Sequence, residues 1–340
     1  MKAVYVEEPF KTVVKQIPKP IIGENEVLIK VRCAGVCGSD LHVYRGAHAF
    51  RKPPVILGHE MSGVIEEIGG KVTKFKIGDR VTVMPQISCG KCNACISGYP
   101  NICSNKKVPG VGDWIGTFGE YFNAPEDIVV KLPENVDFDE GAMAEPLAVA
   151  IHVLKSIDKR NRNHLIILGS GTIGLLIMAV APFFGFNKIL ITDILDYNLK
   201  MAQRLGATRT VNVLKENYMD IMKETFEGKK ADAVIIAAGG PNILDQAIES
   251  VNAKGIIVYL AMITKPVTFH SYPIVYQELM IKGSQTYTLK DFMDAVDIIA
   301  EKKINFKDLI THRYDIDDVE FAMELVDKKL EDSVKVMLHV

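Results

Sequence analysis

The sequence predicts an α/β fold in which an irregular β-rich domain is followed by a doubly wound parallel sheet. Residues 1–84 read as short alternating strands broken by glycine and proline, of which 26–33 (EVLIKVRC) is the clearest. After residue 147, strands alternate with helices, which is typical of a parallel sheet covered by helices. The 340 residues leave room for two domains of roughly 100–200 residues each.

The first part of the chain is expected to form an irregular, barrel-like β domain. Its predicted strands are residues 1–7, 26–33, 61–68 and 79–84, with turns at Gly23-Glu24, Gly69-Gly70 and Gly78-Asp79. The pattern changes at residues 133–150, where a small, acidic segment leads into an apolar helix at 147–154. We therefore expect a domain junction near this helix.

The remainder of the chain predicts alternating strands and helices. The predicted strands are residues 164–168, 188–192, 233–237 and 255–260, and the helices between them are 173–184, 198–205 and 243–251. Two further helices, 289–300 and 317–327, precede a strand at 334–340. Strands in this order are expected to pair in parallel.

Composition narrows the possible partners and compartments. A formal net charge of −2 gives no reason to expect nucleic acid, and the charged, alternating start is unlike a secretory signal. Residues 165–186 run for 22 residues without a charge, but Gly169, Gly171, Gly174 and Pro182 interrupt them. We expect a buried strand, turn and helix there and no membrane span. Six cysteines in tight spacing without an export signal favour metal binding in the reducing cytoplasm.

One short segment, residues 36–61, concentrates the reactive side chains of the chain. They are Cys37, Ser39, Asp40, His42, His59 and Glu60. Thiolate, imidazole and carboxylate are the donors that zinc prefers, and a catalytic zinc keeps one position open for water or substrate. We predict a catalytic zinc here, with Asp40 as a buried structural carboxylate. Cys33 is expected in a strand core. The remaining histidines are assigned no function, namely His48, His152, His164, His270, His312 and His339.

A second cysteine pattern lies in a lobe at residues 86–104. Cys89, Cys92, Cys95 and Cys103 are separated by two, two and seven residues. Four thiolates can close a tetrahedral zinc site that has no room for substrate, so this zinc should be structural. Four unrelated buried cysteines and an iron–sulfur cluster are the alternatives.

A glycine-rich turn predicts a dinucleotide site. Gly169-Ser-Gly171-Thr172-Ile173-Gly174 follows an apolar strand and opens a helix, and Asp193 ends the next strand. The glycines permit a tight turn, close approach of a pyrophosphate and helix packing, while the helix N-terminus faces the anion. Asp193 can accept hydrogen bonds from ribose hydroxyls and would repel a 2′-phosphate, which favours NAD over NADP. The alternative is a purely structural turn.

A hydride carrier combined with a Lewis-acid metal suggests alcohol oxidation, because the cation stabilises negative charge that develops on the alcohol oxygen. The proton must reach water. Ser39 can accept it and His42 can pass it on.

These motifs together resemble the zinc-dependent medium-chain dehydrogenase/reductases along the whole chain. The matching segments are Cys37-Gly-Ser-Asp40, Gly58-His59-Glu60, Gly78-Asp79-Arg80-Val81, the lobe at 89–103 and the turn at 169–174. The resemblance implies a GroES-like catalytic domain of residues 1–146 and 285–340, interrupted by a Rossmann NAD-binding domain of residues 147–284. It also implies a small-molecule substrate bound between the domains, two zinc ions per chain, and homodimers or homotetramers.

Glu145 points to one branch of that family. Classical alcohol dehydrogenases carry a third ligand cysteine at this position, whereas glutamate is similar to the polyol branch. There Cys37, His59 and Glu60 would surround the zinc, and Glu145 would bind it or stand just outside, exchanging with water. The expected reaction takes a secondary alcohol of a polyol, sugar phosphate or sugar acid to the ketone. Alternatives are L-threonine 3-dehydrogenase, 2,3-butanediol dehydrogenase and a non-catalytic NAD-binding regulator.

Several positions depart from the family pattern. Thr286 replaces an arginine of sorbitol dehydrogenases, and the tryptophans that threonine dehydrogenases carry after the His42 region are absent. An arginine common near the adenosine is Asn198 here, which leaves Lys200 as a substitute contact with NAD. An acidic substrate would need cations, and Arg45, Arg51 and Lys52 could supply them.

Overall fold

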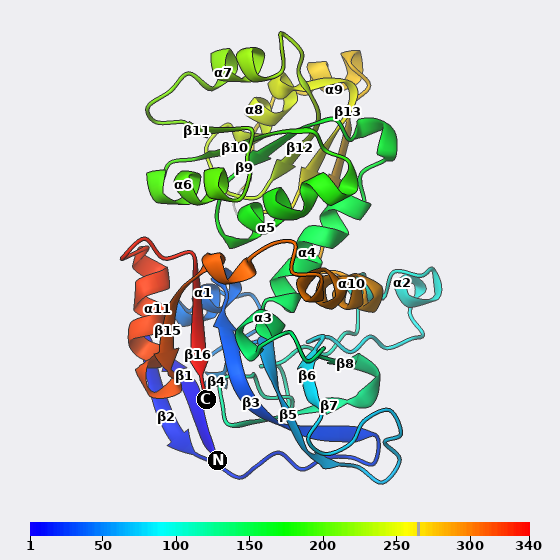
Figure 1. The fold of residues 1–340 in the computed structure, drawn as a ribbon, viewed down its shortest axis with the longest axis vertical. Coiled ribbons are helices and arrows are strands. Elements are labelled where there is room, and N and C mark those ends of the chain that lie inside the picture. Colours follow the sequence, from blue (N-terminus) through cyan, green and yellow to red (C-terminus); the bar gives the residue numbers. More distant parts are fainter. Residues whose placement is uncertain (264–265) are drawn as a thin grey trace. The chain divides into compact units, whose positions relative to one another are not determined.

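The computed structural model describes residues 1–263 and 266–340, which form two compact units (Figure 1). The first unit combines Met1–Ala148 with Thr288–Val340, and the second is Val149–Tyr287. Helix α4 (Ala144–Lys155) runs through the point at which the first unit gives way to the second. The predicted α/β class is confirmed.

The first unit is dominated by mixed and antiparallel strands. Its strands are β1 (Lys2–Glu8), β2 (Lys11–Gln16), β3 (Glu26–Val36), β4 (Val55–Ile56), β5 (Glu60–Ile68), β6 (Arg80–Val83), β7 (Tyr121–Pro125), β8 (Val129–Lys131), β15 (Ile310–Asp315) and β16 (Lys335–His339). The larger sheet has the order β15-β16-β3-β5-β6-β8, with β7 also paired to β3, and β2-β1-β4 form a small sheet. The central strand β3 therefore pairs with β16 from the other end of the chain.

Short helices fill the ends and faces of this unit. They are α1 (Gly38–Tyr44), α2 (Asn93–Ile96), α3 (Phe138–Ala142), α10 (Leu289–Ala300) and α11 (Val319–Lys328). Helix α1 begins directly after β3, and Asp40 fixes its start by accepting a hydrogen bond from the Cys37 backbone N–H at 3.1 Å. The strand and its cap thus place Cys37 at a defined corner of the sheet.

The second unit contains a parallel sheet of the order β11-β10-β9-β12-β13-β14. The strands are β9 (His164–Leu168), β10 (Lys188–Asp193), β11 (Arg209–Asn212), β12 (Ala231–Ile236), β13 (Val251–Tyr259) and β14 (Met280–Gly283). The helices are α5 (Thr172–Val180), α6 (Asp196–Arg204), α7 (Tyr218–Thr225), α8 (Ile243–Ser250) and α9 (Tyr272–Tyr276). The order reverses between β9 and β12, which is the point where doubly wound folds bind nucleotides.

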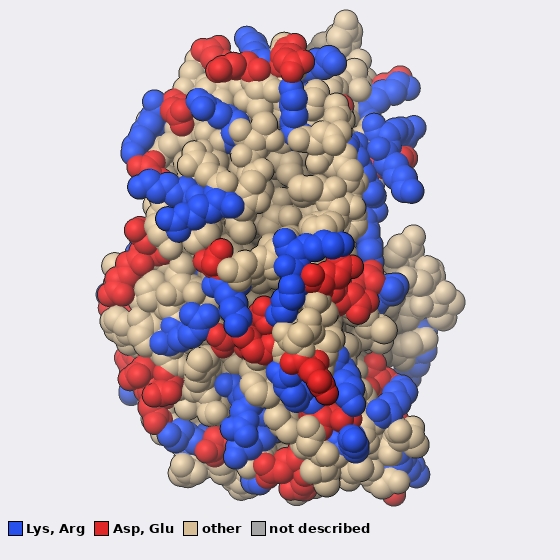
Figure 2. Space-filling model, in the orientation of Figure 1, with Lys and Arg blue, Asp and Glu red and all other residues tan. Residues whose placement is uncertain are grey.

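The uncharged segment at 165–186 forms β9, the glycine turn and α5, as predicted. Helix α5 ends at Val180, earlier than predicted, and Ala181–Phe184 continues as a 3₁₀ turn. Pro182 explains the difference because it has no backbone N–H to continue the helix. Within the described residues, no helix combines the length and apolar character needed to cross a membrane. On the face shown in Figure 2, basic and acidic side chains are interspersed.

Candidate metal centres and nucleotide site

The structure brings Cys37, His59 and Glu60 together, with donor atoms that all lie within 4.8 Å of one another. Cys37 follows β3, while His59 and Glu60 stand at the start of β5, which is antiparallel to β3 with Gly35 opposite Glu60. Glu60 is 1% exposed and Cys37 is partly exposed. The pairing of two strands therefore creates the donor group from residues 22 positions apart in the sequence.

Asp40 lies behind His59 and is fully buried. Its Oδ1 is 3.5 Å from His59 Nδ1, a contact that directs the other ring nitrogen away from the carboxylate. Burial alone would lower the pKa of His59, but the negative charges of Asp40 and Cys37 raise it well above its usual range. The site thus attracts positive charge, and its thiolate, imidazole and carboxylate donors fit a zinc ion with an open position.

Lys335 is a member of this site that the sequence did not reveal. It lies on β16 at 2% exposure, and its ammonium donates hydrogen bonds to Glu60 Oε2 and, at 3.1 Å, to the Val36 carbonyl. The signal available was a single lysine within an apolar strand, residues 334–338 (VKVML). Because one Glu60 oxygen accepts a hydrogen bond from this lysine, the carboxylate is not wholly available to a metal ion.

Ser39 and His42 lie three residues apart on α1, which places both on one side of the helix. Both are partly exposed, whereas Asp40 on the same helix is buried. Glu145 lies in the first turn of α4 and is 8% exposed. It lies outside the three-residue group whose donors share the 4.8 Å limit, although its charge contributes to raising the pKa of Lys335, which burial alone would lower.

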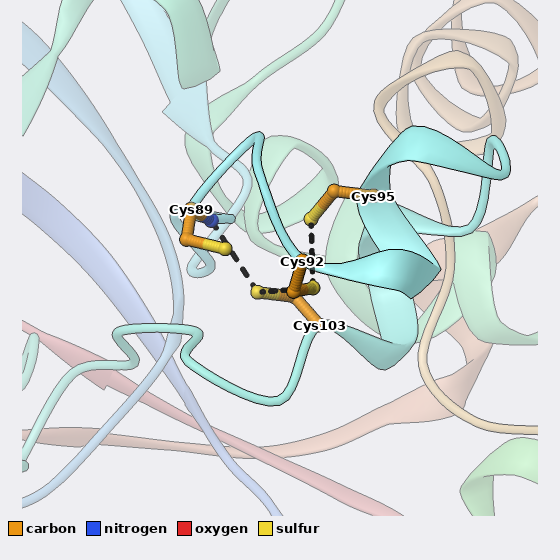
Figure 3. Close-up of side chains that lie close together, drawn as sticks. All are labelled: Cys89, Cys92, Cys95 and Cys103. Carbon is orange, nitrogen blue, oxygen red and sulfur yellow. Dashed lines mark hydrogen bonds between the residues drawn. The ribbon is translucent and has the colours of Figure 1, made fainter.

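The second donor group consists of the four cysteines Cys89, Cys92, Cys95 and Cys103 (Figure 3). The sulfur of Cys92 is 3.5 Å from that of Cys95 and 3.8 Å from that of Cys103. Sulfurs at the corners of a zinc tetrahedron lie about 3.8 Å apart, whereas those of a disulfide are about 2.0 Å apart. The spacing therefore fits a metal-thiolate site with all positions filled by protein.

Hydrogen bonds and burial give these thiols different pKa values. Backbone N–H groups of Cys95 and Ser104 lower the pKa of Cys92 to about 5. Removal from water and the neighbouring sulfurs of Cys92 and Cys103 raise the pKa of Cys95 to about 11. Only part of the cluster can ionise by itself, so a divalent cation is the partner that would allow four thiolates together.

The glycine turn lies where the order of the parallel sheet reverses. Gly169 has φ +109°, and a Cβ there would lie 2.4 Å from Ala238 Cβ, just beyond β12. A Cβ on Gly174 would lie 2.0 Å from the Gly169 carbonyl oxygen, so α5 can approach the turn only with glycine. Around Gly171 the space is open, because none of the described residues other than its chain neighbours comes within 4 Å of the position that a Cβ would take. Thr172 and Ile173 begin α5 and are partly exposed, so a pyrophosphate fits at this helix N-terminus.

Asp193 ends β10 and is held firmly beside this turn. Its Oδ2 accepts hydrogen bonds from the backbone N–H and the hydroxyl of Ser170 at 2.7 and 2.8 Å. Its Oδ1 accepts from the N–H groups of Ile194 and Leu195 at 2.7 and 3.1 Å. Ser170, between the first two glycines, is a second residue that sequence reasoning missed. A ribose hydroxyl can replace the Ser170 hydroxyl as a hydrogen-bond donor to Asp193.

The remaining predicted positions differ in exposure. On α6, Asn198 is buried and Lys200 is exposed, so of the two the lysine can more easily reach a ligand in solvent. Of the candidate cations, Arg45 is paired with Asp327 and Lys52 lies 3.5 Å from the Gly46 carbonyl. Arg51 Nε is buried without a hydrogen-bond partner among the described residues, and the charge of Arg51 acts on Asp40.

Comparisons with known proteins identify the family. The family described as "Alcohol dehydrogenase GroES-like domain" matches residues 23–134, and the family described as "Zinc-binding dehydrogenase" matches residues 172–301. A probable D-xylulose reductase A of Aspergillus clavatus is 36% identical over 309 residues, which cover 89% of this chain and 86% of the relative. Sorbitol dehydrogenase 1 of Saccharomyces cerevisiae is 32% identical over 332 residues, which cover 95% of this chain and 93% of the relative.

A solved structure agrees with these sequence matches. An Escherichia coli enzyme, described as a short chain alcohol dehydrogenase complexed with NADH, superposes with a TM-score of 0.93 at 31% identity, covering 100% of this chain and 99% of that one. The chain belongs to the zinc-dependent medium-chain dehydrogenase/reductase family.

Proposed function

We propose that the protein oxidises a secondary alcohol of a polyol, sugar phosphate or sugar acid to the ketone, with NAD as hydride acceptor. The balanced reaction converts the alcohol and NAD⁺ to the ketone, NADH and one proton. The observation that carries the proposal is the group of Cys37, His59 and Glu60, with Asp40 orienting the imidazole. The names of the xylulose and sorbitol relatives support the polyol class.

Zinc, when bound, supplies a Lewis acid that stabilises negative charge developing on the substrate oxygen, and NAD supplies the hydride acceptor. The protein's own groups handle the proton. Ser39 Oγ accepts it from the substrate hydroxyl, and the His42 imidazole carries it to solvent. Their shared side of α1 and their partial exposure support this relay.

Substitution of His42 tests the relay. His42→Ala should slow turnover most at low pH, where loss of the proton from the substrate is hardest. The measurement is kcat against pH for both proteins. An unchanged pH–rate profile would remove His42 from the mechanism.

Glu145 is proposed to act at the edge of the metal site, binding zinc or exchanging with water. A carboxylate is a harder ligand than a thiolate and suits substrates that offer two oxygens. Glu145→Ala should therefore change zinc content or kcat. If both stay as in the wild type, this role is withdrawn.

The substrate is best identified by an NAD-reduction screen across polyols, sugar phosphates, sugar acids, diols and L-threonine, with zinc analysis alongside. We expect activity with a polyol or a related sugar derivative. Higher activity with threonine or 2,3-butanediol would favour those alternative dehydrogenases. No activity with two zinc ions bound would favour a non-catalytic regulator. If Arg51→Gln abolished a preference for acidic substrates, this would indicate that the Arg51 guanidinium binds the acidic group of the substrate.

We further propose that the protein works as a homodimer or homotetramer in the cytoplasm. Strand β14 is an edge strand, and an apolar patch beside it exposes Tyr272, Val275, Tyr276 and Met280 by 51–77%. Exposed apolar patches at a sheet edge favour association with a second copy. The free thiols of all six cysteines support a reducing compartment.

Light scattering tests the assembly. Val275→Lys with Met280→Lys should halve the mass, giving monomers from a dimer or dimers from a tetramer, whereas Leu214→Lys, which changes an exposed apolar residue elsewhere, should not. A wild-type monomer, or equal masses for both variants and the wild type, would contradict this interface.

A further inference from the structure

A third group of potential metal ligands lies in the first unit. It consists of Cys33 on β3, Asp139 on α3 and His339 on β16, with donor atoms that all lie within 4.8 Å of one another. Cys33 and His339 are direct partners in the antiparallel pairing of β3 with β16, so their side chains share one face of the sheet. Helix α3 brings Asp139 onto this face.

The thiol and the imidazole converge on one carboxylate oxygen. Asp139 Oδ1 lies 3.3 Å from Cys33 Sγ and 2.8 Å from His339 Nε2. The Arg313 guanidinium uses the other oxygen, with Nε 2.6 Å from Oδ2. Arg313 therefore does not occupy the space between Cys33 Sγ, Asp139 Oδ1 and His339 Nε2.

Hydrogen bonds join the three side chains in this structure. Burial, reinforced by Asp139, raises the pKa of Cys33 well above its usual range, so the thiol keeps its proton and donates it to the carboxylate. The positive charges of Lys335 and Arg313 oppose that rise. One cation could replace both the thiol proton and the hydrogen shared by His339 and Asp139.

We propose that Cys33, Asp139 and His339 form a third cation site that takes a thiophilic divalent ion such as Zn²⁺. Sulfur, nitrogen and oxygen ligands of a tetrahedral zinc lie about 3.3–3.8 Å apart, which small side-chain shifts within the observed limit can reach. With the Cys33 thiol ionised, Cys33, Asp139 and Glu60 carry three negative charges beside the two positive charges of Arg313 and Lys335, so a net charge of −1 attracts the ion. His339 is the exposed member, at 44%, and leaves the fourth position to water.

Ion binding would replace the hydrogen of the Cys33 thiol, because a metal ion binds the thiolate. The groups near the thiol are Asp139 from α3, Arg313 from β15, and Lys335 and His339 from β16. The ion would also tie β3, β16 and α3 together. This site is separate from the two family zinc positions, because it shares no ligand with them.

The test measures zinc per chain by equilibrium dialysis of the zinc-loaded full-length protein against buffered Zn²⁺, followed by metal analysis. We expect a third equivalent in the wild type, loss of that equivalent in Cys33→Ser and His339→Gln, and retention in His312→Gln, which removes a histidine of β15 outside the group. Because His339 is a surface residue, His339→Gln should fold and keep two zinc ions even if Cys33→Ser does not fold.

A third equivalent that both variants lose and that His312→Gln retains supports the site. A wild-type stoichiometry of two overturns it. A third equivalent that survives in His339→Gln shows an adventitious ion only, and also overturns it.

Discussion

Replacing Lys335 with methionine should strongly destabilise the first unit. Lys335 is 2% exposed and Glu60 is 1% exposed, and the lysine also donates to the Val36 carbonyl at 3.1 Å. Methionine keeps the length of the side chain but leaves Glu60 charged, buried and without this partner. Removal of one member of a buried ion pair costs about 3–5 kcal/mol, because the remaining charge is uncompensated.

The chain offers a selective probe for this measurement. Trp114 is the single tryptophan, it is 8% exposed, and it belongs to the first unit. Its fluorescence during urea unfolding of the zinc-depleted protein therefore follows that unit. With a urea dependence of roughly 2–3 kcal/mol per M, Lys335→Met should lower the midpoint by roughly 1–2.5 M.

Two further variants separate charge from packing. Lys335→Met with Glu60→Gln removes both charges and should regain at least half of the lost stability. Lys71→Met breaks the pair with Glu24, in which both side chains are exposed, and should leave the urea midpoint nearly unchanged. Equal midpoints for the single and double Lys335 variants would refute the electrostatic reasoning and assign the loss to packing.

Four other outcomes follow from the geometry. Gly174→Ala places a Cβ 2.0 Å from the Gly169 oxygen, so kcat/KM for NAD should fall by up to about 100-fold, and an unchanged NADH affinity by fluorescence titration would contradict the packing argument. Asp193→Ser removes charged hydrogen bonds, so the ratio of kcat/KM for NAD to that for NADP should fall by about tenfold or more; an unaltered ratio would mean that Asp193 does not select the cofactor. Cys103→Ser should lose one bound zinc per chain relative to the wild type and lower the urea midpoint of Trp114, and full zinc retention would speak against the four-thiolate site. Burial would raise the pKa of Asp139, but hydrogen bonds from Arg313, His339 and Cys33 lower it below 3.8, so its stabilising effect is complete above that pH and is lost as pH falls through the lower folded value. Asp139→Asn should therefore flatten the loss of stability below about pH 4 in acid-unfolding curves, and parallel curves would contradict this.

The sequence predicted the bounds of those helices and strands that begin or end at a local sequence signal. Strand β9 and helix α10 have the predicted bounds, because an apolar run ends at Gly169 in one case and Thr288 caps the helix in the other. Strand β14 was not predicted, because its four residues include the exposed Met280 and show no alternation.

The candidate sites also differ in whether the local sequence could predict them. The donors of residues 36–61 and 89–103 are close in sequence, so spacing indicated them. Lys335 and the group of Cys33, Asp139 and His339 depend on the pairing of β16 with β3, which no local pattern specifies. The predicted boundary after residue 146 came from the resemblance, since α4 runs through this region without a turn or linker.

The pairing of β3 with β16 also imposes an order on biosynthesis. Lys335 follows Glu60 by 275 residues, so on the ribosome the carboxylate is made long before its counter-charge. The second unit, Val149–Tyr287, is contiguous and can fold while the first still lacks two strands of its main sheet. During this interval the edge of β3 that later pairs with β16 lacks its partner strand, and an unpaired edge of this kind favours association with other chains.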